Sequence, residues 1–130
     1  FIERSMPLHA KNNIPLPSTY APFRTGIDMF GDEEIILVEL PGHAAGHIGC
    51  FIQSHHGTPV FLIADASWTT RSYKEHIVPH PITKILFSDY TAYQKTLRDL
   101  CEFSTKRPDY LIIPSHCPHI HKSYCNKGTL

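Results

Sequence analysis

Two short runs of this sequence are almost wholly apolar, and they constrain the fold more than any other feature. They are Val60 to Ile63 and Tyr110 to Ile113, each shorter than an ordinary helix. A strand that has no polar position suits a sheet covered on both faces. Pro114 closes the second run, because proline interrupts a strand. We therefore expect a buried sheet with other layers packed against it.

Other strands are predicted upstream of these runs. Ile27 to Phe30 and Glu34 to Leu40 are expected to pair as a β-hairpin about a Gly31-Asp32 turn. Ile48 to Gln53 alternates weakly and is expected to form a further strand. Strands that alternate with helices indicate a layered α/β fold.

The clearest helix signal runs from Asp89 to Ser104. Ser88 or Asp89 can cap its first turn, and Pro108 stops it. A shorter helix is expected over Thr69 to His76. The apolar face of the longer helix repeats at spacings of three and four and consists of Tyr90, Tyr93, Leu97, Leu100 and Cys101.

The length of 130 residues suits one domain with a core of its own. Four prolines and little periodicity predict an extended arm over residues 1–25. The domain itself is expected over residues 26–121, and a polar, frayed tail over residues 122–130. Because the first residue is not Met, we expect the chain to be a piece of something longer.

Composition narrows the function classes. Twelve basic and twelve acidic side chains balance, so we expect no nucleic-acid partner and no attraction to anionic membranes. No apolar run approaches the roughly 18 residues of a membrane span, and we expect that the first residues are not a signal peptide. The four cysteines contain no CxxC pair, which favours free thiols in a reducing cytoplasm.

Histidine is the one overrepresented residue, with ten in the chain, and it is the commonest metal ligand. The segment Pro41-Gly42-His43-Ala44-Ala45-Gly46-His47 follows an apolar strand directly. Its glycines permit a sharp turn, and the turn presents two imidazoles beside the strand end. A surface loop with incidental histidines would show the same residues.

Two further segments of this kind follow the wholly apolar runs. Asp65 stands after the first run between alanines, where a carboxylate is costly to bury unless it is paired or binds a metal. Ser115 and His116 follow Pro114 after the second run. A capping aspartate and a proline-fixed turn are the alternative interpretations. Together, His43, Asp65 and His116 each come just past a strand end and are expected to meet at one rim of the sheet.

This order of motifs resembles the second half of the metallo-β-lactamase superfamily. The resemblance covers roughly residues 26 to 120 and rests on PGHxxGH, an aspartate about twenty residues later and a final Ser-His. The stretch from Asp65 through Pro79 is most similar to the branch that opens N-acyl-homoserine lactones. The resemblance implies a fold that is the C-terminal half of an αββα sandwich.

The resemblance also implies roles for single residues. His43 and His116 would each bind one of two metal ions, and Asp65 would bridge them. His47, Trp68 and Ser115 would lie around the ligands or in the substrate pocket. Two zinc ions are expected in the intact parent, with iron or manganese as alternatives. A metal-bound hydroxide would attack a lactone, thioester, amide or phosphoester of a small-molecule substrate.

The sequence departs from that family at two places. It has no HxHxDH motif, which supplies most metal ligands in the family, and Trp68 stands where the lactonases have a tyrosine. We therefore expect a chain that is inactive alone, and that forms a homo-oligomer or pairs with a missing N-terminal half. An iron redox enzyme of the same fold and a non-catalytic remnant used for binding are the alternative functions.

Overall fold

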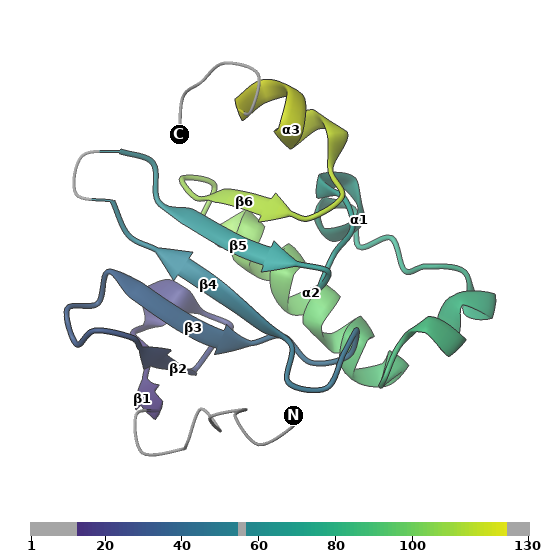
Figure 1. Cartoon of the computed structure of the whole chain (residues 1–130), viewed down its shortest axis with the longest axis horizontal. Helices are drawn as coiled ribbons and strands as arrows, with labels where there is room; N and C mark the ends of the chain where they lie inside the picture. The colour runs from purple at the N-terminus through teal and green to yellow at the C-terminus, as the bar shows by residue number, and fades with distance from the viewer. Residues whose placement is uncertain (1–12, 55–56, 125–130) are drawn as a thin grey trace, which may run out of the picture.

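The computed structural model describes residues 13–54 and 57–124. Six strands of this part of the chain form one sheet in the order β1-β2-β3-β4-β5-β6 (Figure 1). Neighbouring strands are antiparallel, except that β5 and β6 are parallel. The strands are β1 (Asn13–Pro15), β2 (Thr25–Asp28), β3 (Ile35–Glu39), β4 (Ile48–Ile52), β5 (Val60–Ala64) and β6 (Leu111–Pro114).

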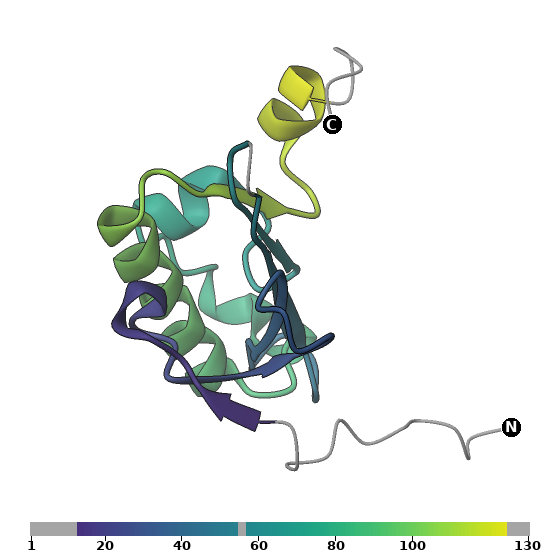
Figure 2. The same ribbon diagram turned by 90° about the vertical axis from the view of Figure 1, so that its left-hand side faces the viewer.

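Helices connect the two parallel strands, as a parallel pair requires a crossover. The connection contains α1 (Thr70–Lys74), the 3-10 helix η3 (Pro81–Leu86) and α2 (Tyr90–Lys106). The short helix α3 (Pro118–Tyr124) follows β6. Figure 2 views the sheet nearly edge-on and shows α1 and α2 on the same side of it.

Most of the elements expected from the sequence are confirmed. The hairpin β2–β3 pairs Ile27 with Leu37, and both strands lie within about two residues of the predicted bounds. Helix α2 begins after Asp89, whose Oδ1 accepts a hydrogen bond from the N–H of Ala92 at 2.9 Å. It extends two residues beyond the predicted end, to Lys106.

The core lies between the sheet and α2. Phe51 of β4 stacks on Phe61 of β5 with ring centroids 3.8 Å apart, and Phe103 of α2 packs against both. All three side chains are fully buried. This aromatic cluster fixes the distance and direction of α2 relative to the strands whose ends carry the predicted site.

Within the described residues the apolar strands are covered on one face only, and what covers the other face stays a prediction. In β5, Phe61 and Ile63 are 0% exposed, whereas Leu62 between them is 38% exposed. Strand β6 shows the same alternation of buried and half-buried residues. The reason is that the described helices α1 and α2 pack on one side of the sheet only (Figure 2).

The expectation of an arm without regular structure is wrong for residues 13–25. Strand β1 pairs with β2, and Ser18–Tyr20 forms a 3-10 turn, η2. Tyr20 and Phe23 are buried in the core against Phe51. The prolines here separate short segments that still bury aromatic rings.

Residues 1–12 and 125–130, where the rest of the predicted arm and tail fall, lie outside the described residues. Residues 122–124 of the predicted tail are helical, since they belong to α3. The domain bounds at residues 26 and 121 stay a prediction. Within the described ranges, no helix has both the length and the apolar character needed to cross a membrane.

Candidate functional site

The loop that carries His43 is held by the start of α2. The N–H of Asp89 donates to the carbonyl of Gly42 at 3.0 Å, and the N–H of Ser88 donates to that of His43 at 3.2 Å. Gly42 has a φ of +127°, and a Cβ built there would lie 2.2 Å from the backbone nitrogen of Tyr93. Only glycine permits so close an approach, so the helix start fixes where the imidazole stands.

Asp65 is presented by a strained turn at the end of β5. Ala64 has a φ of 44°, in the left-handed region, and the pairing of β5 with β6 shifts register there. The N–H of Ala66 returns to the carbonyl of Ile63 at 3.0 Å. Strain of this kind costs on the order of 1–3 kcal/mol and clusters at functional sites. The turn places Asp65 directly after the end of β5.

The structure brings the three predicted ligands together at one rim of the sheet. His43 Nε2 lies 3.7 Å from Asp65 Oδ2, and His116 Nε2 lies 3.2 Å from Asp65 Oδ1. One imidazole therefore stands at each oxygen of the carboxylate. The His43 side chain is 26% exposed and that of His116 is 68% exposed, so the cluster opens to solvent.

These residues fit metal ligation in donor type and separation, but not in number. Bonds of about 2.0–2.2 Å place two donors of one zinc ion at most about 4 Å apart, which both separations satisfy. Each side of Asp65 has one imidazole, whereas a catalytic zinc ordinarily has three protein ligands. Among residues 13–54 and 57–124, no three His, Cys, Asp or Glu side chains form a group that could hold an ion.

Ser115 contacts the cluster directly, since its hydroxyl donates to Asp65 Oδ1. Its N–H also donates to the carbonyl of Ala64 at 3.2 Å, which ties the end of β6 to the end of β5. The hydroxyl thus restrains one oxygen of Asp65. The role that the resemblance implies for Ser115, next to the ligands or in the substrate pocket, stays a prediction.

His47 forms no hydrogen bond with His43 in the described structure. Its Nδ1 lies 3.1 Å from the carbonyl oxygen of Leu40, and its ring is 5.9 Å from that of His43. The Nδ1 of His43 is buried and has no hydrogen-bond partner among the described residues. His47 therefore closes its own loop onto β3, and its role at the site stays a prediction.

Phe87 lies next to the candidate site, although the sequence analysis did not predict a role for it. Its ring meets His43 edge-on at 5.7 Å and stacks on Trp68 at 6.1 Å. Trp68 is thereby placed beside the site, half-buried against the core. Phe87 falls in the irregular segment between η3 and α2, where no periodicity marks it. These two rings form an apolar wall next to His43.

Cys117 lies directly after His116 and is buried. Burial raises the pKa of its thiol, but hydrogen bonds from the Thr70 side chain and from backbone N–H groups outweigh burial, so the pKa lies below its ordinary value. Cys117 Sγ lies 3.1 Å from Thr70 Oγ1. This contact joins the His116 segment to the start of α1.

No family model matches the chain, and no curated protein sequence matches it. Several solved structures do match it. An N-acyl homoserine lactone hydrolase with the product N-hexanoyl-L-homoserine bound at the catalytic metal centre is 22% identical, with a TM-score of 0.61. The B. thuringiensis protein AiiA, in a variant with N-decanoyl-L-homoserine at its active site, gives the same two values. A quorum-quenching N-acyl homoserine lactone lactonase is 24% identical, with a TM-score of 0.57.

The matches cover much of this chain but a smaller part of the others. They include 76% or 70% of this chain and 36% or 35% of the lactonase chains. The chain thus spans about a third of the length of those proteins. Its fold is that of part of a lactonase of the metallo-β-lactamase type, which confirms the fold expected from the sequence.

Proposed function

We propose that this chain supplies one part of the active site of a metal-dependent hydrolase that opens lactones. The single observation that carries the proposal is the cluster in which His43 and His116 face opposite oxygens of Asp65. The fold that this chain shares with N-acyl homoserine lactone hydrolases also supports a hydrolase that acts on lactones.

The three side chains have complementary tasks in this proposal. Neutral imidazoles of His43 and His116 would each donate to one metal position, and the Asp65 carboxylate would face both. Two zinc ions are proposed, since imidazole and carboxylate donors suit zinc, with iron or manganese as alternatives. A bound divalent ion lowers the pKa of water and polarises a carbonyl group.

The surroundings supply positioning and an apolar contact. Ser115 restrains Asp65 through its hydroxyl, and the start of α2 restrains His43 through the backbone. The ring of Phe87 offers an apolar surface beside His43 on which a small acylated substrate would rest. Trp68 stacks on Phe87 and is proposed to form part of the same apolar surface. It stands where the lactonases have a tyrosine, so it offers no hydroxyl there.

Histidine NMR with added zinc tests the proposal on the chain itself. In a ¹⁵N-labelled chain, we expect zinc to shift the Nε2 resonances of His43 and His116, and Asp65→Asn to weaken the apparent affinity at least tenfold. Because each side of Asp65 offers only two donors, the apparent dissociation constant should lie far above that of a complete zinc site.

His80→Ala is the matched control, because His80 is an exposed histidine at the start of η3. The His80→Ala variant should bind zinc as the unsubstituted chain does. Unchanged His43 and His116 resonances at millimolar zinc would refute the proposed ligand set. An equal loss of affinity in Asp65→Asn and His80→Ala would refute it as well.

A further inference from the structure

The 3-10 helix η3 begins at a histidine whose side chain caps it. Nδ1 of His80 accepts a hydrogen bond from the N–H of Ile82 at 3.3 Å, and the carbonyl oxygen of His80 accepts one from the N–H of Thr83 at 2.8 Å. Thr83 Oγ1 donates to the same carbonyl oxygen at 2.7 Å. Because Pro81 has no N–H, His80 satisfies both N–H groups with which the helix begins.

Both ends of η3 are held by contacts with α2. Before η3, Tyr90 Oη donates to the carbonyl oxygen of Pro79 at 2.9 Å. After it, Phe87 packs on Tyr93 with ring centroids 4.2 Å apart, and its side chain is buried. The helix itself projects from the body of the molecule beyond the start of α2 (Figure 1). Unwinding of η3 would therefore stay between these two anchors.

An imidazole caps a helix only while one of its ring nitrogens lacks a proton. Neutral His80 with its proton on Nε2 leaves Nδ1 as the acceptor for the N–H of Ile82. A protonated ring carries a hydrogen on both nitrogens and a positive charge, which is unfavourable at a helix N-terminus. Histidine ordinarily gains this proton near pH 6.5. The cap is therefore present at higher pH and is lost as the pH falls through the protonation of the ring.

The charged groups of the elements beside η3 keep their charge over this range. Lysine and arginine ordinarily titrate near pH 10 or above, and carboxylates near pH 4. Arg71 pairs with Glu75 at 2.9 Å, and the ammonium of Lys84 lies over the ring of Tyr90. The charged residues concerned are Arg71, Lys74 and Glu75 at α1, Lys84 in η3 and Asp89 before α2.

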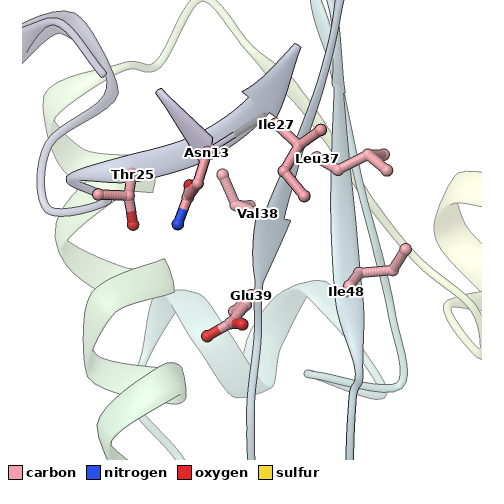
Figure 3. Close-up of a pocket in the computed structure, with 8 residues that line it drawn as sticks. Asn13, Thr25, Ile27, Leu37, Val38, Glu39 and Ile48 are labelled. Atoms are coloured by element: carbon pink, nitrogen blue, oxygen red, sulfur yellow. The ribbon is translucent and has the colours of Figure 1, made fainter. Parts of the chain in front are cut away.

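Glu39 lies in a different part of the molecule. Its carboxylate lines a cavity of about 160 Å³ with Asn13 and Thr25, at the ends of β1, β2 and β3 (Figure 3). Figure 1 shows these strand ends far from η3. The Glu39 carboxylate therefore does not face His80.

His76 is the other imidazole in the connection between α1 and α2. Its Nε2 is buried and has no hydrogen-bond partner among the described residues, and its φ is 48°. It titrates by the same chemistry as His80 but makes no contact that caps a helix. An experiment on η3 must therefore distinguish these two histidines.

We propose that His80 makes η3 a pH-sensitive element, which is wound while the imidazole is neutral and unwinds when the imidazole is protonated. The inference does not depend on the proposed activity. Residues three apart eclipse in a 3-10 helix, so wound η3 presents Ile82 and Ile85 side by side. These side chains are 77% and 88% exposed. The protonation of His80 thus controls whether the chain displays this apolar ridge.

The Cα chemical shifts of residues 82–86 measure the winding of η3, because helical backbone moves them away from random-coil values. In a ¹³C,¹⁵N-labelled chain without added metal, we expect these shifts to move towards random-coil values between pH 8 and pH 5. The ratio of wound to unwound η3 should fall about fivefold, the ordinary size of an N-cap contribution. The midpoint should coincide with that of the His80 Cε1 resonance, which reports the protonation of the ring.

Two substitutions of His80 separate the cap from its titration. Asparagine caps helices and has no titratable group, so His80→Asn should keep η3 wound from pH 8 to pH 5. Alanine offers no acceptor, so His80→Ala should leave η3 unwound at both pH values. His76→Asn is the matched control, since asparagine tolerates a left-handed φ. This variant should keep the pH dependence of the unsubstituted chain.

Three outcomes overturn the proposal. They are Cα shifts that do not change between pH 8 and pH 5, a pH dependence that persists in His80→Asn, and a pH dependence that His76→Asn abolishes. The last outcome would assign the titration to His76. Circular dichroism of each variant at both pH values shows that the sheet and α2 are retained, so that a change in the shifts belongs to η3.

Discussion

At the scale of single residues, the contrast between Phe51 and Phe30 shows how position decides what a side chain contributes. Phe51 is fully buried and contacts the rings of Tyr20, Phe23, Phe61, Phe103 and Tyr110. Phe30 is 70% exposed in the turn of the β2–β3 hairpin. The two side chains are chemically identical, so a difference in their energetic weight measures the packing of the core.

Phe51→Ala should lower the free energy of unfolding by about 3–5 kcal/mol, because it removes a buried ring and leaves a cavity among rigid neighbours. Phe30→Ala should change it by no more than about 0.5 kcal/mol. Urea denaturation followed by circular dichroism measures both. Equal losses in the two variants would mean that the aromatic cluster is not the centre of the core.

At the scale of elements, the start of α2 and the Pro41–His47 loop behave as one unit. Thr96 Oγ1 donates to the carbonyl of Pro41 at 2.7 Å. The backbone N–H groups of Ser88 and Asp89, just before α2, add the two bonds to the loop described above. The loop, and with it the imidazole, follows any displacement of the helix. Gly42 lies at the point of closest approach, whereas Gly46 faces open space.

Gly42→Ala should therefore destabilise the chain far more than Gly46→Ala. The first variant adds left-handed strain and forces the loop away from Tyr93, so we expect a loss of about 2–4 kcal/mol. The second adds only the strain of a φ of +71° in open space, which costs about 1–2 kcal/mol. Parallel urea titrations measure the difference. Equal costs would show that the loop does not pack on α2.

At the scale of the whole molecule, the candidate site faces solvent and has too few donors. The His116 side chain is 68% exposed, and each side of Asp65 offers one imidazole. The chain spans about a third of the length of the lactonases that it resembles in fold. A hydrolytic metal centre also excludes bulk water and holds its ion through several ligands.

For this reason we expect the chain alone to hydrolyse N-hexanoyl homoserine lactone negligibly, even with added zinc. Titration of the released carboxylic acid at constant pH measures the rate, and a sample without protein corrects for spontaneous opening. Turnover near ordinary enzyme rates, about 1–10³ per second, would show that the residues present complete the site.

The sequence alone was sufficient to predict the elements and the candidate ligands. Local patterns mark the elements, since Asp89 caps a helix whose apolar positions recur every three or four residues. The candidate ligands each follow an apolar strand, and the resemblance to a known family implies their roles. The sequence also predicted that these residues meet at one rim. They do so because β3, β5 and β6 run in the same direction, so that their C-terminal ends lie at one edge of the sheet. The layered α/β fold could be predicted from the same order of elements.

Only the tertiary structure decided which surfaces are covered. The apolar runs Val60 to Ile63 and Tyr110 to Ile113 do not show in sequence whether one or both faces of their strands are buried. Burial depends on which segments from elsewhere in the chain pack against each face. Tyr20 and Phe23 joined the core, and Phe87 joined the site, through contacts distant in sequence that no local period records. The contact of His47 Nδ1 with the carbonyl oxygen of Leu40, seven residues away, is likewise visible only in the structure.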